Sequence, residues 1–125
     1  MERHAVIVAG FGFRAEATLA SLQDALASAQ HGQAQVTRLA TPRDKAPLVE
    51  RLAEAMDLLL VAIDPDALRA AQTATKSAFS LKIRQTGSVA EACALAAAGP
   101  GARLLTPRHI SHDRMATCAI AEGFA

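Results

Sequence analysis

Short apolar segments alternate with segments of helical periodicity along this chain, and this alternation limits the available folds more than any other feature. Between the first two apolar segments, Leu19, Leu22 and Leu26 recur three and four residues apart, which is typical of a helix with one buried face. Parallel strands need a crossover of a dozen or so residues, usually a helix. The pattern therefore predicts parallel strands with helices on both faces of a sheet. The predicted strands span residues 5–9, 36–39, 58–63, 103–106 and 115–121.

The last two predicted strands are joined differently from the others. Only the segment PRHISHDR separates them, and it is too short for a helical crossover, so they are expected to run antiparallel. No repeat or long linker divides the chain. We therefore predict a single domain over residues 1–125, with three α/β/α layers and a mixed, mostly parallel sheet of about five strands.

Local signals mark where the predicted helices begin. Pro47 is acceptable in the first turn of a helix over 44–56, because first-turn amides lack intrahelical partners. Asp64 followed by Pro65 predicts an N-cap and the first helical position. Ser88 and Glu91 have the spacing of a capping box at the start of an alanine-rich helix. That helix can pack on the sheet or on a second copy of the chain, so a homodimer stays open.

The composition excludes several classes of protein. Hydrophobic residues make up 51% and charged residues 20% of the chain, without an apolar tract of membrane-spanning length, so we expect a cytoplasmic globular protein with no membrane contact. The net charge of +1, the four Phe and the lack of Trp and Tyr do not suit a nucleic-acid binder. Cys93 and Cys118, far apart and without CxxC spacing, are expected to be buried, reduced thiols.

The segment VAGFGFR is the strongest candidate for a binding site. It follows the first predicted strand, where ligands of α/β sheets often bind. We expect Gly10 and Gly12 to form a tight turn whose main-chain N–H groups, with those of the next helix, bind an anion. Arg14 adds a fork of donors for a carboxylate or phosphate, and Thr18 adds a hydroxyl one turn later. The alternative is that the glycines only shape the turn and that Arg14 is solvated.

Other sites are less well supported by the sequence. No acidic residue ends the second strand and no GK[ST] follows the glycines, which argues against dinucleotide and P-loop sites. No catalytic triad or pair of catalytic carboxylates can be assigned, and no cofactor is expected. His109 and His112 form an H-x-x-H pair that could bind a metal with Asp113, but two or three ligands without further partners are more typical of a polar turn.

Several segments, taken in order, resemble a known family. VAGFGFR, TPRDKAPLVERLAEAM, GSVAEACALAAAG, ARLLTPR and MATCAIA are similar to the CobE family and to the C-terminal domain of CbiG, both of cobalamin biosynthesis. The resemblance covers nearly the whole chain and departs from the family at Phe13, Ala15 and Ala46. CbiG-like proteins carry an additional N-terminal region, so the resemblance here implies the free-standing CobE type of the aerobic pathway.

The resemblance implies a ligand as well as a pathway. Precorrins and corrin acids are flat apolar rings fringed by acetate and propionate carboxylates, and Arg14, Lys45 and Arg108 could pair with these groups while Phe11 and Phe13 contact the ring. We expect a binding protein that carries such an intermediate, with other cobalamin-pathway enzymes as candidate partners. The alternative is an enzyme that opens a lactone or rearranges the same ring, as CbiG-like proteins imply. The predicted ligand-binding residues are Gly10, Phe11, Gly12, Phe13, Arg14, Thr18, Lys45, Ser88 and Arg108.

Overall fold

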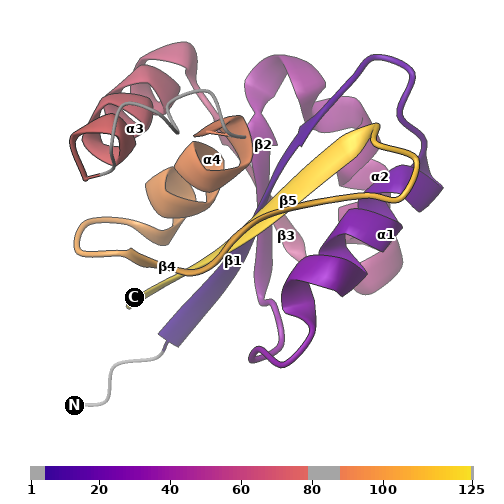
Figure 1. Ribbon diagram of the computed structural model, residues 1–125, viewed down its shortest axis with the longest axis horizontal. Coiled ribbons are helices and arrows are strands. Elements are labelled where there is room, and N and C mark those ends of the chain that lie inside the picture. Colours follow the sequence, from indigo (N-terminus) through magenta and orange to yellow (C-terminus); the bar gives the residue numbers. More distant parts are fainter. Residues whose placement is uncertain (1–4, 79–87, 125) are drawn as a thin grey trace.

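The structure is a computed structural model that describes the backbone of residues 5–78 and 88–124 and the side chains of residues 5–71 and 89–124. Within these residues, strands and helices alternate as the sequence predicts (Figure 1). The strands are β1 (Ala5–Phe13), β2 (Arg38–Pro42), β3 (Leu59–Ile63), β4 (Arg103–Ile110) and β5 (Ala116–Phe124). The helices are α1 (Leu19–Gln30), the 3₁₀ turn η1 (Arg43–Lys45), α2 (Ala46–Met56), α3 (Pro65–Ala78) and α4 (Ser88–Ala98).

The strands form one mixed sheet in the order β3-β2-β1-β5-β4. β1, β2 and β3 are parallel, whereas β5 is antiparallel to both of its neighbours, β1 and β4. β4 therefore runs in the same direction as β1, and β5 alone among the described strands is reversed. This confirms the predicted α/β domain with a five-stranded mixed sheet whose last two strands are antiparallel.

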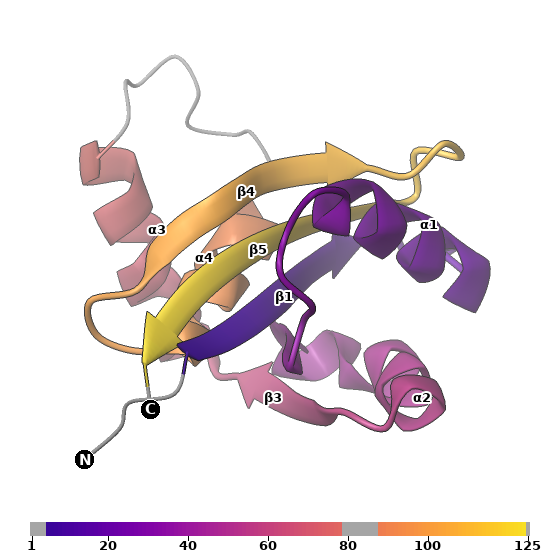
Figure 2. The ribbon, with the colours of Figure 1, turned by 90° about the horizontal axis from the view of Figure 1, so that it is seen from below.

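Helices cover both faces of the sheet (Figures 1 and 2). α1 and α2 pack on one face, where Phe11, Leu22, Leu39 and Leu52 belong to one buried cluster. α4 packs on the opposite face, where Val8 and other buried residues form a second cluster, and α3 lies against α4. The three predicted layers are present.

Two glycines allow α4 to lie very close to the sheet. A Cβ atom added to Gly10 of β1 would lie 2.5 Å from the backbone nitrogen of Ala94 and would collide with the carbonyl oxygen of Ala90. A Cβ on Gly123 of β5 would collide with the carbonyl oxygen of Ala98. The small side chains of α4 make the matching surface. The alanine-rich helix therefore packs on the sheet, which is the first of the two packings that the sequence left open for it.

The predicted turn at residues 10–14 is wrong. β1 does not end at residue 9 but continues to Phe13, and α1 begins only at Leu19, with Thr18 as its N-cap. All nine residues of β1 pair with β5, from Ala5 opposite Phe124 to Phe13 opposite Ala116. Cross-strand pairing with a distant segment thus overrides the local preference of Gly10 and Gly12 for a turn.

The fourth strand is also longer than predicted. β4 extends through Pro107 to Ile110, into the segment expected to be a loop. It lies at an edge of the sheet, and its register against β5 shifts twice between Leu104 and His109. Proline is tolerated in edge strands and at bulges, because the missing N–H is not needed there for the ladder.

Among the other local predictions, the second strand is displaced, because β2 spans Arg38–Pro42 and not residues 36–39, whereas those for Pro47, α3 and the two cysteines are confirmed. Pro47 lies in the first turn of α2, and the Leu68 N–H donates to the Asp64 carbonyl at 2.9 Å where α3 begins. Cys93 and Cys118 are free and fully buried. None of the helices in the described ranges has the length and apolar character needed to cross a membrane.

Candidate functional site

A pocket opens where the parallel strands end. From this edge β1 leads to α1 on one face of the sheet, whereas α4 begins on the other face, with Val89 beside Gly12, so the pocket lies between the starts of the two helices. The pocket has a volume of about 390 Å³. We call it the arginine pocket, and it is lined by Gly12, Phe13, Arg14, Val89, Arg108, Ile110, Arg114, Met115, Ala116 and Thr117.

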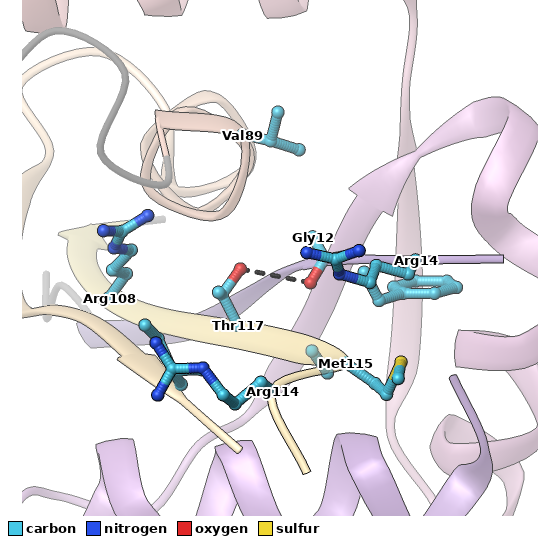
Figure 3. Close-up of a pocket in the computed structure, with 10 residues that line it drawn as sticks. Gly12, Arg14, Val89, Arg108, Arg114, Met115 and Thr117 are labelled. Carbon is cyan, nitrogen blue, oxygen red and sulfur yellow. Dashed lines mark hydrogen bonds between the residues drawn. The ribbon is translucent and has the colours of Figure 1, made fainter. Parts of the chain in front are cut away.

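Three arginines determine the charge of this pocket. Figure 3 shows Arg14, Arg108 and Arg114 placed around Thr117, with Val89 of α4 on one side. Arg14 and Arg114 are exposed and Arg108 is half-buried. Within the described residues, no carboxylate forms an ion pair with these guanidinium groups, and no lining residue is acidic. The arrangement is therefore suited to bind an anion.

The N–H of Arg14 is held by the sheet, and its carbonyl begins the turn that follows β1 by accepting the Ala17 N–H at 3.0 Å. The Arg14 N–H donates to the carbonyl of Met115 at 2.9 Å, directly after the last pair of the β1–β5 ladder. The neighbouring carbonyl of Gly12 accepts a bond from the Thr117 hydroxyl at 3.1 Å. The Arg14 N–H, expected to be free for a ligand, is thus occupied. Side chains, and not a main-chain cradle at residues 10–14, supply the positive groups of the pocket.

The bulged edge strand β4 and helix α4 together position Arg108. One register shift in β4 precedes Arg108, between Leu104 and Thr106, and the second lies between Thr106 and His109, so Arg108 stands in the irregular part of the strand. The buried carboxylate of Glu91 in α4 accepts a hydrogen bond from the Arg108 N–H at 3.2 Å. Glu91 therefore links α4 to the pocket strand, a role that the capping-box prediction did not include. The capping partner Ser88 begins α4, but its side chain lies outside the described residues.

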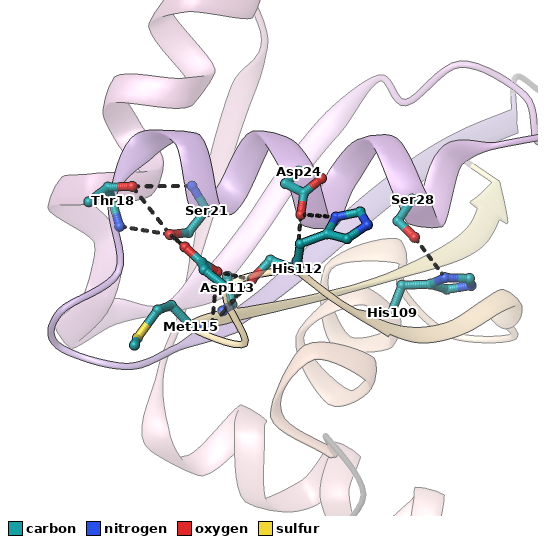
Figure 4. A network of polar contacts seen from close by, with 10 residues as sticks. Thr18, Ser21, Asp24, Ser28, His109, His112, Asp113 and Met115 are labelled. Carbon is teal, nitrogen blue, oxygen red and sulfur yellow. Dashed lines mark hydrogen bonds and ion pairs between the residues drawn. The ribbon is translucent and has the colours of Figure 1, made fainter.

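A hydrogen-bonded loop positions Arg114, which the sequence analysis did not single out. Arg114 has a left-handed backbone with φ 63°, and its N–H donates to the Ser111 carbonyl at 2.9 Å. The Asp113 carboxylate accepts bonds from the Ser111 hydroxyl, from the Ser21 hydroxyl of α1 at 2.6 Å and from the Met115 N–H at 3.0 Å (Figure 4). These bonds hold the pKa of Asp113 below its usual value. The loop is thereby fixed to α1.

The two histidines of the H-x-x-H pair lie at the end of β4 and in this loop. The N–H and the ring Nδ1 of His112 lie 2.6 Å and 2.8 Å from one Asp24 oxygen, and the bonds from His112 lower the pKa of Asp24. His109 Nδ1 lies 3.2 Å from the Ser28 hydroxyl. Figure 4 shows the two imidazoles meeting different residues of α1. Among the described residues, no three His, Cys, Asp or Glu side chains gather closely enough to hold a metal ion.

The other predicted ligand-binding residues lie outside the pocket or at its margin. Gly10 packs against α4, and Phe11 is fully buried in the core, so neither can reach a ligand in the pocket. The hydroxyl of Thr18 accepts the Ser21 N–H as the N-cap of α1. Phe13 lines the pocket, and Lys45 Nζ lies 5.2 Å from the centre of its ring, so Lys45 stands next to the pocket.

Of the predicted ligand-binding residues, Gly12, Phe13, Arg14 and Arg108 do line one pocket, although the first three lie at the end of β1 and Arg108 lies in β4. Sequence reasoning missed Arg114, Met115 and Thr117. The available signal was the segment SHDR, in which an Asp stands just before an Arg in a short strand connection, a pattern that favours a side-chain-stabilised turn.

Taken together, the fold and the pocket define a small α/β domain with an arginine-lined pocket at the carboxyl edge of its sheet. The family model of the cobalamin synthesis G C-terminus matches residues 7–121. The chain therefore belongs to the CbiG C-terminal and CobE family and is a cobalamin biosynthesis protein, as its sequence motifs indicated.

Solved structures agree with this assignment. The chain is similar to CobE, a protein from the cobalamin (vitamin B12) biosynthetic pathway, with 28% identity and a TM-score of 0.75 over 94% of this chain and 90% of that one. It is 41% identical to the cobalamin biosynthesis protein chiG from Agrobacterium tumefaciens str. C58, with a TM-score of 0.72 over 93% and 97% of the two chains.

A more distant structure shares the fold alone. This is a cobalamin biosynthesis protein G homologue from Sulfolobus solfataricus, with 18% identity and a TM-score of 0.67 over 94% of this chain and 36% of that one. The comparison with curated proteins finds no match.

Proposed function

We propose that this protein binds a precorrin or corrin acid at the arginine pocket and acts in aerobic cobalamin assembly as a carrier or accessory protein. The observation that supports this most is the convergence of three guanidinium groups without carboxylate partners among the described residues. Such ligands carry several carboxylates, which arginines bind in a bidentate manner. Membership of a cobalamin biosynthesis family makes this class of polyanion the relevant one.

The size and lining of the pocket suit one edge of such a ring. Its volume of about 390 Å³ is near the lower end of small-molecule sites, which span roughly 300–1,000 Å³. The carboxylate fringe would enter the pocket, while the ring itself would lie over the apolar rim. Ile110, a lining residue that is 42% exposed, offers such an apolar contact.

The energetics of binding depend on how well the ring excludes water. A hydrogen bond to a charged group contributes about 1.5 to 3 kcal/mol. The contribution falls toward about 0 to 1 kcal/mol for exposed pairs. Because Arg108 is half-buried and Arg14 and Arg114 are exposed, Arg108 is expected to contribute most, and the other two gain strength only when the ring covers them.

Carriage is supported over catalysis by the chemistry of the lining. Among the described residues that line the pocket there is no carboxylate, imidazole, thiol or amine to serve as a general base or nucleophile. The Thr117 hydroxyl already donates to Gly12. A role in which the protein holds the ring and passes it to a pathway enzyme needs none of these groups.

Mixing the protein with a series of precorrin-stage pigments tests this proposal. The absorption spectrum reports binding, and the mass of the recovered pigment reports chemistry. We expect a shifted spectrum and an unchanged mass, with affinity reduced about tenfold in Arg108→Gln, equal to about 1.4 kcal/mol. Arg51→Gln, an exposed arginine of α2, is the matched control. A changed mass would instead favour an enzyme, and an unaltered spectrum with every pigment would refute both roles.

A further inference from the structure

We infer that the arginine pocket selects free carboxylates against the corresponding carboxamides, so that its ligand is a tetrapyrrole whose fringe has not been amidated at the bound edge. This inference rests on the proposed function, because it specifies the ligand of the same pocket. It goes further by stating which chemical form of the ring side chains the protein accepts and which it rejects.

The charged side chains that face the pocket offer only hydrogen-bond donors. Each guanidinium presents five N–H donors and no acceptor. Arg14, Arg108 and Arg114 therefore surround the pocket with donors only, and Lys45 beside Phe13 adds another donor at the margin. A carboxylate has only acceptors when ionised, so every atom that it brings can be paired.

The acceptors on the lining side chains are few. They are the hydroxyl oxygen of Thr117 and the thioether of Met115, which is a weak acceptor. The Thr117 hydrogen is already directed to the Gly12 carbonyl. A carboxamide that enters the pocket brings two N–H donors of its own, which would face guanidinium donors. Those N–H groups would lose water without gaining partners, and a buried unpaired donor is costly.

The two acidic side chains linked to the pocket lining or its loop, those of Glu91 and Asp113, do not relieve this mismatch. The carboxylate of Glu91 accepts the N–H of Arg108, is buried, and is not part of the lining. Asp113, which precedes Arg114, is likewise engaged with Ser21 and Ser111. Glu91 thus holds the backbone of Arg108, and Asp113 holds the loop that carries Arg114, so both carboxylates already accept bonds from the protein.

General electrostatic attraction alone would not give this selectivity. The chain has a net charge of only +1, so a polyanion is attracted mainly by local groups. Exposed arginines elsewhere, such as Arg51 on α2, contribute to any long-range attraction as much as the pocket arginines do. Only an arginine in the pocket sets the balance of donors and acceptors around a bound side chain.

The test compares an octacarboxylate porphyrin with the same porphyrin converted to its carboxamides, each titrated calorimetrically at about 150 mM salt, where the Debye length is about 8 Å. We expect the acid to bind about tenfold or more tightly than the amide. In Arg108→Gln, the new amide oxygen supplies an acceptor, so the preference should fall toward equality. Arg51→Gln should leave the preference unchanged.

The outcomes separate this inference from the proposed function. Equal affinity of the wild-type protein for the two porphyrins would overturn the inference and leave the binding function standing. A preference that falls equally in Arg108→Gln and Arg51→Gln would overturn it too. Binding of neither porphyrin would refute the proposed function and the inference with it. Arg14→Gln, at an exposed position, provides the same comparison if Arg108→Gln does not fold.

Discussion

Replacement of Gly10 by alanine should destabilise this protein strongly, although the residue lies in a motif that resembles a ligand-binding turn. The new Cβ would lie 2.5 Å from the Ala94 nitrogen and would collide with the Ala90 carbonyl. Both are backbone atoms of α4, so the strain can be relieved only by moving the helix. Overpacking usually costs about 1 to 3 kcal/mol, and rigid neighbours place this case at the upper end. Subtracting the roughly 0.5 to 1 kcal/mol by which alanine is favoured over glycine leaves a net loss of about 2 kcal/mol.

Gly12→Ala is the matched control, because its Cβ would meet side-chain atoms instead. The Thr117 hydroxyl and a Val89 methyl would each lie 3.2 Å away, and both side chains can adjust. We expect a loss below about 1 kcal/mol there. Urea unfolding followed by circular dichroism measures the loss of stability in both variants, and in thermal melts the Gly10 variant should unfold about 8 °C below wild type. Equal stability of the two variants would refute the argument that Gly10 serves helix–sheet contact.

Three further results are expected. Hydrogen bonds hold the pKa of Asp113 and of Asp24 below the usual value, so the stability that these carboxylates provide is present at neutral pH and is lost as the pH falls below about 4. In thermal melts from pH 7 to pH 2, the melting temperature of Asp113→Asn should therefore fall less steeply than that of the wild type. An equally steep fall would contradict this. Burial raises the pKa of Cys93 to about 12 and also raises that of Cys118. Neither thiol should therefore react with a thiol reagent until the protein unfolds. Fast labelling of the native protein would contradict this and show that the core is open to solvent. Glu91→Ala should lower the free energy of unfolding by about 1.5 to 3 kcal/mol, because the Arg108 N–H loses a charged acceptor, and wild-type stability in urea would argue against that contact.

Local sequence signals predict which strands and helices form better than they predict where these elements begin and end. The first-turn position of Pro47 in α2 and the start of α3 after Asp64 followed from the sequence, because proline position and capping act within one turn of the chain. Helix α2 itself begins at Ala46, two residues later than predicted. The end of β1 did not follow, since Phe13 is kept in the strand by pairing with Ala116, more than a hundred residues away. The glycine motif predicts a turn at position 10, whereas the structure shows that a glycine is needed there because α4 packs so closely on the strand.

In the candidate site, too, local sequence signals predict some residues and long-range contacts determine the others. Arg14 and Arg108 were predicted because they follow or end strands, and the strand order brings them to one edge. Arg114 could not be placed from sequence, because its position depends on the bonds of Asp113 to Ser21 on a helix far away in the chain. Local motifs thus suggested an anion site, while long-range contacts determine which side chains form it.

The most direct measurement of the central claim is an NMR titration of the isotope-labelled protein with the octacarboxylate porphyrin, in which each backbone amide reports the binding position. We predict that the amides of Gly12, Arg14, Arg108 and Thr117 shift progressively with added porphyrin. The amides of a second groove, which lies between α3 and the end of α4 and is lined by residues that include Ala70, Leu95 and Ala102, should stay unchanged. Shifts that gather in that groove, with the arginine pocket unaffected, would contradict it.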